Sequence, residues 1–165
     1  MGPTDFGGRL SVLPATWRDY RQVLALERVC FNEDAWPWID ILGALTFPDT
    51  VRLKAELDGR VVGFAVGDLR RREDLGWIAT IGVHPDFRRL GIGRCLLLAC
   101  EEALSTGRIR LTLRLSNSGA RQLYERNGYV EIDRLGRYYR DGEGAYVMEK
   151  VRVPAGAAER HDQQP

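Results

Sequence analysis

The sequence predicts an α/β fold in which a mixed sheet of about seven strands is flanked by about four helices. Residues 51–58 alternate strictly between apolar and charged side chains, which is the period of a strand. Later segments repeat apolar residues every three or four positions, as helices do, and alternate with further strand-like runs. A length of 165 residues suits one domain. We expect this domain to span residues 1–153 and the small, polar residues 154–165 to form a disordered tail.

The first elements are a strand and a helix. Residues 9–13 are strand-like. Thr16, with Asp19 three positions later, is typical of a capping box. We therefore expect a helix that opens at Thr16 and runs to Cys30.

A second short helix and three strands follow. Pro37 interrupts the helical pattern, so a new helix is expected over residues 38–47. Asp58 and Gly59 are typical of a tight hairpin turn between two strands. A charged loop then separates the second strand from a third, and we expect all three to be antiparallel neighbours. These strands are predicted over residues 51–57, 60–69 and 77–83.

The second half predicts two more helices and three more strands. Ser116 or Asn117 can cap the second of these helices, and Gly128 can end it, because glycine adopts the left-handed conformation of a C-cap. In chain order, the helix, strand, helix and two strands are expected over residues 91–105, 108–115, 116–128, 129–138 and 144–151.

Composition disfavours several classes of protein. Twenty-four basic and 23 acidic residues leave a net charge of +1, so no global field attracts nucleic acid or an anionic membrane. The cysteines Cys30, Cys95 and Cys100 lie in apolar stretches without metal-ligand spacing, so we expect buried reduced thiols and no metal. No apolar run approaches the roughly 20 residues of a membrane span, and no signal peptide is apparent, so the cytoplasm is expected.

The segment HPDFRRLGIGRC, which begins at His84, predicts a site for an anion. A helix that starts directly after a strand presents free backbone amides, and its glycines allow a phosphate to approach closely. Arg88, Arg89 and Arg94 add positive charge. The segment lacks the glycine patterns of ATP-binding and NAD-binding loops, so a different diphosphate is favoured. His84 itself is expected to be a loop residue rather than a catalyst.

Three segments resemble the GNAT superfamily of N-acetyltransferases. VHPDFRRLGIGRCLL resembles the R/Q-x-x-G-x-G/A signature, whose loop binds the diphosphate of coenzyme A. LRLSNSGARQLYERNGY resembles the family segment that carries a capping Asn and a Tyr beside the thioester. GRYYRDGEGAYVMEK resembles the two-tyrosine hairpin of the N-terminal protein acetyltransferases, including those that act on ribosomal-protein alanine. Together the likeness covers residues 9–151.

The resemblance implies acetyl-CoA as cofactor and direct transfer of acetyl to an amine. It also implies that the strand leading into the phosphate loop is splayed from the next strand, so that a backbone amide faces the thioester carbonyl. The cofactor-binding residues that it implies are Ile81, Gly82, Val83, Arg88, Arg89, Leu90, Gly91, Ile92, Gly93, Arg94, Asn117 and Tyr124.

Tyr124 matches the family tyrosine that protonates the leaving sulfur, and a phenol with a pKa near 10 stays protonated at neutral pH. A core tyrosine on an amphipathic helix would show the same spacing, so both interpretations stand. Asn117 likewise can be a helix cap, a cofactor contact or both. An acyl-enzyme is not expected, because no cysteine lies in the matching acceptor segments.

The general base departs from the family pattern. Thr112 stands where the ribosomal-protein alanine acetyltransferases carry a glutamate, and Trp77 occupies another position that the superfamily uses. Neither side chain can accept a proton. Glu33 or Asp34 could act through water, although exposed loop acids are usually only solvated. His161 lies in the expected tail.

A site without a strong base suits an α-amine, which is already partly neutral near pH 7.5. Tyr138 and Tyr139 resemble the hairpin tyrosines that hold a peptide's first residues. Phe31, Trp36 and Trp38 either wall the pocket for the first side chain or cover the core. We therefore expect a protein or peptide N-terminus as acceptor and a monomer or homodimer; a small-molecule amine acetyltransferase and a non-catalytic acyl-CoA-binding module are the alternatives.

Overall fold

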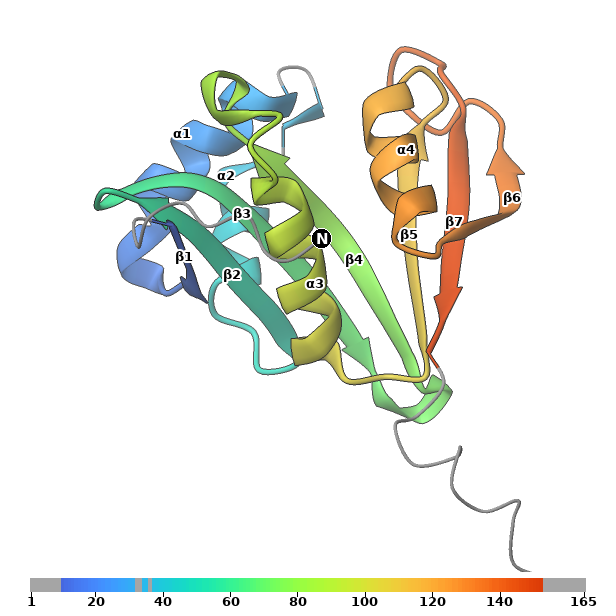
Figure 1. Cartoon of the computed structure of the whole chain (residues 1–165), viewed down its shortest axis with the longest axis horizontal. Coiled ribbons are helices and arrows are strands. Elements are labelled where there is room, and N and C mark those ends of the chain that lie inside the picture. The colour runs from blue at the N-terminus through green and yellow to red at the C-terminus, as the bar shows by residue number, and fades with distance from the viewer. Residues whose placement is uncertain (1–9, 32–33, 36, 153–165) are drawn as a thin grey trace, which may run out of the picture.

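The computed structural model describes residues 10–31, 34–35 and 37–152. Within them lie one seven-stranded sheet, in the order β1-β2-β3-β4-β5-β7-β6, and four α-helices (Figure 1). All neighbouring strands are antiparallel except β4 and β5, so the sheet is mixed. The predicted fold class is confirmed. The expected tail lies outside the described residues.

The first strand is β1 (Leu10–Pro14), and the first two helices are α1 (Tyr20–Phe31) and α2 (Trp38–Ala44). The capping box is present, but it opens a short 3-10 turn that precedes α1, so α1 starts later than expected. α2 ends three residues before the predicted boundary at residue 47. The backbone amides of Thr46 and Phe47 both donate to the Gly43 carbonyl, at 3.0 and 2.9 Å, and this tight turn ends the helix.

Three antiparallel strands follow, as predicted: β2 (Thr50–Leu57), β3 (Arg60–Arg70) and β4 (Leu75–Val83). Asp58 and Gly59 form the turn between the first two, with φ of 50° and 78°. Such positive φ values at both central positions match the twist of a two-residue hairpin.

The remaining elements are α3 (Ile92–Leu104), β5 (Arg108–Arg114), α4 (Ser118–Arg126), β6 (Val130–Leu135) and β7 (Ala145–Val151). Gly128, with φ of 89°, follows α4 as expected. The prediction that β6 continues to residue 138 is wrong. Arg137 has φ of 51°, and the amides of Tyr138 and Tyr139 both donate to the Glu143 carbonyl at 2.9 and 3.0 Å, so these tyrosines lie in the hairpin loop.

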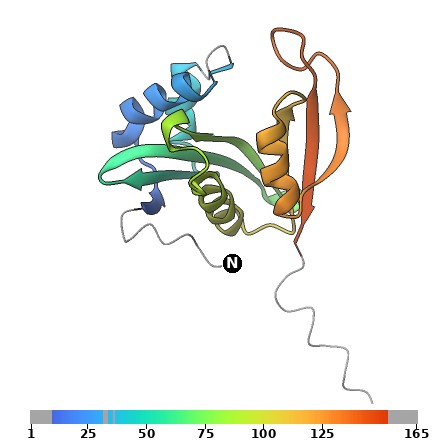
Figure 2. The ribbon, with the colours of Figure 1, turned by 45° about the horizontal axis from the view of Figure 1, so that its top comes forward.

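The helices cover both faces of the sheet. Side chains of α1 and α2 pack with β3 in one buried cluster, whereas α3 and Tyr124 of α4 pack with β2 to β5 and β7 in another. Figure 2 shows α1 and α3 on opposite sides of the sheet. Each face therefore has its own apolar core, as a central sheet requires.

β4 and β5 diverge in the middle of the sheet. They pair only where Leu75–Ile78 lies beside Arg108–Leu111, although β4 continues to Val83 and β5 to Arg114. Figure 1 shows the two strands separating toward α4. The expected splay is thus present, and within the described ranges it leaves one edge of β4 without a strand partner beyond Ile78.

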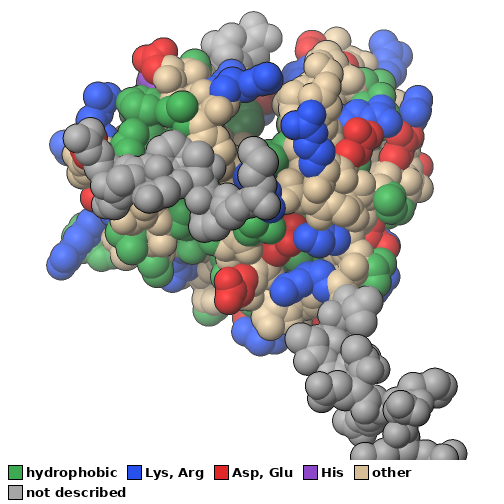
Figure 3. Space-filling view, viewed as in Figure 1, with side chains coloured by type: hydrophobic (Ala, Val, Ile, Leu, Met, Phe, Trp, Pro, Cys, Tyr) green, Lys and Arg blue, Asp and Glu red, His purple; other side chains and the backbone are tan. Residues whose placement is uncertain are grey.

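The surface charges, the helix lengths and the cysteines can be compared with the sequence expectations. Basic and acidic side chains are interspersed over β5 to β7 and α4 in Figure 3. Among the described residues, no helix is long and apolar enough to cross a membrane. All three cysteines are free, as expected, but only Cys100 is fully buried, whereas Cys30 and Cys95 are partly exposed.

Candidate active site

The opening between β4 and β5 contains a cavity of about 810 Å³. The end of β4, the turn before α3, and α4 line it. Eleven of the twelve predicted cofactor residues lie in its wall, and only Leu90, whose side chain is exposed, does not. The eleven are Ile81, Gly82, Val83, Arg88, Arg89, Gly91, Ile92, Gly93, Arg94, Asn117 and Tyr124.

The turn before α3 has the features of an anion site. Arg89 and Gly91 have φ of 66° and 79°, which curls the backbone ahead of the helix. The amide of Cys95 donates to the Gly91 carbonyl at 3.1 Å, and no side chain in the described part of the chain caps the helix. The preceding amides of α3 are therefore outside its ladder of hydrogen bonds, and they suit a diphosphate.

Two side chains hold this turn in place. Arg88 was expected only to supply charge, but its Nε also donates to the Val83 carbonyl at 3.1 Å and so fixes the turn to β4. His84 accepts a hydrogen bond from the Asp86 amide at 3.3 Å, and its ring packs edge-on against Phe87. His84 is thus a turn residue, as expected, and it lines neither of the two cavities described here.

A smaller cavity of about 220 Å³ adjoins the first one. Phe31, Asp34, Arg114 and Tyr124 belong to the walls of both, so the two spaces meet between β4 and β5. Thr112, on β5, also lines the smaller cavity.

Tyr124 lies where the two cavities meet. Its ring is buried and packs edge-on against Tyr129, with centroids 5.7 Å apart. Burial raises the pKa of the Tyr124 phenol far above its ordinary value, and the neighbouring Cys100 and Tyr139 raise it further. Tyr124 thus belongs to the apolar core and to the cavity wall at once, so the structure accommodates both interpretations of its spacing.

Asn117 also combines two positions. Its side-chain oxygen accepts a hydrogen bond from the Ala120 amide at 3.1 Å, which is the predicted N-cap of α4. The same residue lines both cavities. The cap fixes its side chain in the wall that the two cavities share.

The predicted substrate residues only partly gather at the smaller cavity. Phe31, Tyr138 and Tyr139 line it, and Phe31 also packs edge-on against Phe64 of the core at 6.4 Å. Trp36 lies outside the described residues. Trp38 is 57% exposed on α2 and lines neither cavity, so it neither walls the pocket nor covers the core.

At the two positions where the family resemblance places a general base, this chain has side chains that cannot accept a proton. Thr112 faces the smaller cavity, whereas Trp77 lies away from it, beneath the guanidinium of Arg70 at 5.1 Å. Of the loop acids, Asp34 lines both cavities. Glu33, like His161, is outside the described residues.

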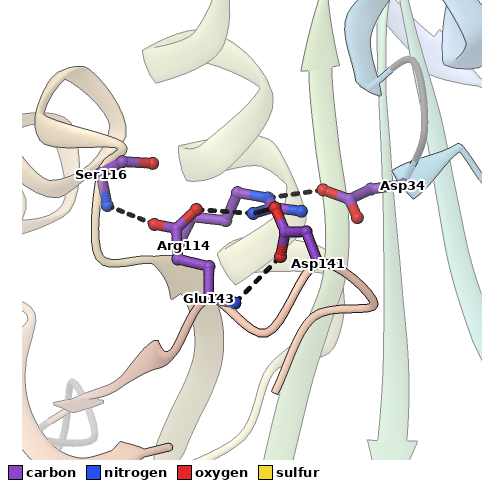
Figure 4. A network of polar contacts seen from close by, with 5 residues as sticks. All are labelled: Asp34, Arg114, Ser116, Asp141 and Glu143. Carbon is purple, nitrogen blue, oxygen red and sulfur yellow. Dashed lines mark hydrogen bonds and ion pairs between the residues drawn. The ribbon is translucent and has the colours of Figure 1, made fainter. Parts of the chain in front are cut away.

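Sequence reasoning missed two charged residues of this site, Glu27 and Arg114. Glu27 lies on α1, is only 1% exposed and lines the smaller cavity. Its position was readable, because Val23, Leu26 and Cys30 place residue 27 on the same helical face. Arg114 ends β5 and contacts three carboxylates (Figure 4). These carboxylates lie far from Arg114 in the sequence, so no local sequence pattern predicts the contacts.

A helix start with free backbone amides beside a splayed strand, with a buried tyrosine lining the same space, is an arrangement that suits acyl transfer from a nucleotide-linked thioester. The chain belongs to the acetyltransferase (GNAT) family, whose model matches residues 13–129. The resemblance read from the sequence is confirmed, and the protein is an acyltransferase that uses acetyl-CoA, rather than a non-catalytic module.

Two relatives agree with this assignment, and a solved structure agrees with the fold. The N-alpha-acetyltransferase of Sulfurisphaera tokodaii is 31% identical over 156 residues, covering 86% of this chain and 93% of that protein. The N-alpha-acetyltransferase RimI of Mycobacterium tuberculosis is 32% identical over 139 residues, covering 82% and 88%. In fold, the ribosomal-protein-S18-alanine N-acetyltransferase of Escherichia coli superposes with a TM-score of 0.81 at 24% identity, over 90% of this chain and 97% of that one.

Proposed function

We propose that this enzyme acetylates the N-terminal α-amine of proteins or peptides. The observation that carries the proposal is the chemistry of the smaller cavity. Two hairpin tyrosines line it, while a threonine and a distant tryptophan occupy the positions expected for a base. The names of the two relatives, both N-alpha-acetyltransferases, support the same acceptor.

The acid–base argument favours an α-amine over a lysine. At pH 7.5, deprotonating a lysine ammonium of pKa about 10.4 costs about 4 kcal/mol, whereas an α-ammonium of pKa about 7.7–8.0 costs less than about 1 kcal/mol. An α-amine therefore needs no strong base, because a fraction of it is already neutral at this pH. Among the described residues, Glu27 and Asp34 are the carboxylates that line the smaller cavity, and Asp34 is paired with Arg114.

The larger cavity accounts for cofactor binding in this proposal. Acetyl-CoA supplies an activated thioester when bound. The free amides at the start of α3, with Arg89 and Arg94 beside them, hold its diphosphate. The unpaired edge of β4 faces the opening and positions backbone groups toward the acyl carbonyl.

Tyr124 serves as the proton donor in this scheme. Its raised pKa keeps the phenol protonated, so its hydroxyl can protonate the leaving sulfur. Cys30 also lines the larger cavity, but burial raises the pKa of its thiol to about 11, although Arg88 nearby lowers it. A thiol in that state is a poor nucleophile, which favours direct transfer to the amine.

A panel of acceptors tests the proposal. Purified enzyme with acetyl-CoA is given one peptide in two forms, one with a free α-amine and an internal lysine, the other blocked at its N-terminus. We expect acetylation of the free form only, with a kcat/KM at least about tenfold above that for diamines or amino sugars. A preference for diamines would instead identify a small-molecule amine acetyltransferase.

A further inference from the structure

Arg114 joins two segments that flank the acceptor side of the opening. Its Nε lies 2.5 Å from the Asp34 carboxylate, which follows α1. One of its terminal nitrogens lies 2.8 Å from Asp141 and 2.5 Å from Glu143, both in the loop between β6 and β7. Figure 4 shows the guanidinium between the carboxylates of the two segments.

The loop that carries the hairpin tyrosines is built around Glu143. The Glu143 carboxylate accepts from Arg114 and from the Ser116 amide at 2.7 Å. The Glu143 carbonyl accepts the amides of Tyr138 and Tyr139. The guanidinium of Arg114 also stacks over the Tyr139 ring, 4.0 Å from its centroid. The positions of both tyrosines therefore depend on Arg114 through backbone, carboxylate and ring contacts.

The charges reinforce this dependence. One guanidinium faces three carboxylates, so removing it leaves three like charges close together and without this shared cation. Their repulsion favours separation of the two segments. Arg114 and Asp34 also line the larger cavity, but the turn before α3 makes no hydrogen bond or ion pair with Arg114 among the described residues, so the diphosphate end of the cofactor site has no such reason to move.

We propose that Arg114 is a positioning residue for the acceptor: it holds the segment at Asp34 and the Tyr138–Tyr139 loop together so that they form the wall against which the amine-bearing chain binds. This inference rests on the proposed function, because it takes the smaller cavity as the acceptor site. In this inference, one arginine sets the geometry of a wall whose two parts lie far apart in the sequence.

Arg114→Gln tests the inference, with Arg110→Gln as matched control. Arg110 lies four residues earlier on β5, is similarly exposed (31% against 22%), and pairs with one carboxylate, that of Glu149, at 2.5 Å. It lines neither of the two cavities. Steady-state kinetics give kcat and KM for the peptide and for acetyl-CoA, and calorimetry gives the Kd for CoA.

We expect Arg114→Gln to raise the peptide KM about tenfold while the Kd for CoA stays within about twofold, and Arg110→Gln to change neither by more than about twofold. Arg114→Lys keeps the charge but cannot span three carboxylates, so its peptide KM should lie between those of wild type and Arg114→Gln. An unchanged peptide KM, or equal losses for peptide and CoA, would overturn the inference.

Glu143→Gln keeps the test decisive if Arg114→Gln does not fold. It should also raise the peptide KM selectively, and in a folded double variant the two effects should be less than additive because both act through one contact. A Glu143→Gln enzyme with wild-type peptide KM counts against the inference. Failure of the proposed function shows up separately, as a wild-type preference for small amines over peptides.

Discussion

Tyr124 shows how a single position can belong to the packed core and to a cavity wall together. The ring fills part of the apolar core, and the burial that this requires is also the main cause of the raised phenol pKa. A phenol with a raised pKa keeps its proton over a wider pH range, although it is also a weaker acid, so in the proposed role Tyr124 stays protonated across the range in which the enzyme would work.

Tyr124→Phe should lower kcat by about 10²-fold or more, because general acid catalysis typically contributes that much, while the Kd for CoA changes by less than about twofold. Tyr146→Phe is the control, since Tyr146 lies on β7 outside both cavities and stacks with Arg121 and Arg134. Rapid-quench or steady-state assays with a peptide acceptor measure the effect. Unchanged turnover would remove Tyr124 from the role of proton donor.

The pH dependence of kcat makes a related test on the wild-type enzyme. Since the folded-state pKa of Tyr124 is raised, its protonated form persists above pH 10, where an ordinary phenol would lose its proton. We therefore expect no fall in kcat attributable to this group up to about pH 10. A fall with an apparent pKa near 10 that disappears in Tyr124→Phe would contradict the assignment of a raised pKa.

Individual elements are fixed by contacts at their ends. Asp19, at the entrance to α1, accepts hydrogen bonds from the amide and hydroxyl of Thr16 at 2.8 and 3.1 Å and from Lys54 of β2 at 2.8 Å. α1 is thereby joined at its start to the sheet. Burial raises the pKa of Asp19, but the hydrogen bonds from Lys54 and Thr16 together lower it more, so its pKa lies below the ordinary value.

Asp19→Asn should reduce the free energy of unfolding by about 1–2 kcal/mol near neutral pH, through loss of the charged cap and its bond to Lys54. A carboxylate with a lowered folded-state pKa adds stability above its unfolded pKa of about 3.9 and loses it as the pH falls further. The difference between wild type and variant should therefore be constant from about pH 5 to about pH 8 and shrink below about pH 4.

Urea titrations across this range measure the effect. Asp49→Asn is the matched control, because Asp49 forms an ion pair with Arg71 in which both side chains are more than 60% exposed, at 64% and 72%. Its loss should cost less than about 0.5 kcal/mol. Equal losses for the two variants would show that the Asp19 contacts are no stronger than a surface pair.

The boundaries of elements show where local patterns stop being informative. The strands from β2 to β4 were predicted because their alternation is local. β6 was predicted to reach Tyr138, since aromatic residues favour strands, but the hydrogen bonds from Tyr138 and Tyr139 to Glu143 and the left-handed Arg137 form a loop instead. Those bonds depend on the position of Glu143, which Arg114 and Ser116 hold.

The part of the molecule from β1 to α3 and the part from β5 to β7 meet at the opening between β4 and β5. The larger cavity takes its walls from β4 and the start of α3 on one side and from α4 on the other. A ligand in this cavity contacts both parts at once and binds only the folded state, so binding and stability are linked.

CoA at about 100 times its Kd should raise the free energy of unfolding by about 2.7 kcal/mol, seen as a higher urea midpoint. Gly93→Asp is the comparison: a Cβ at Gly93 would meet its nearest atoms at 3.6 and 3.7 Å, so the backbone leaves room for one, and in the proposed site the carboxylate would repel a diphosphate at the start of α3. The variant should fold, and the same CoA concentration should raise its free energy of unfolding much less. Equal stabilisation of both proteins would place the diphosphate elsewhere.

The sequence by itself determined the order of the elements, the hairpin at Asp58–Gly59, the glycine turn before α3 and the family. These features depend on side-chain period and turn chemistry within a few residues, so they are readable along the chain. Tertiary structure alone decided that Asp34 meets Arg114 across 80 positions, and that the two cavities share Tyr124. The Asp34–Arg114 contact arises because the sheet brings distant segments side by side. The two cavities meet because β4 and β5 diverge, and the packing of the whole molecule sets that divergence.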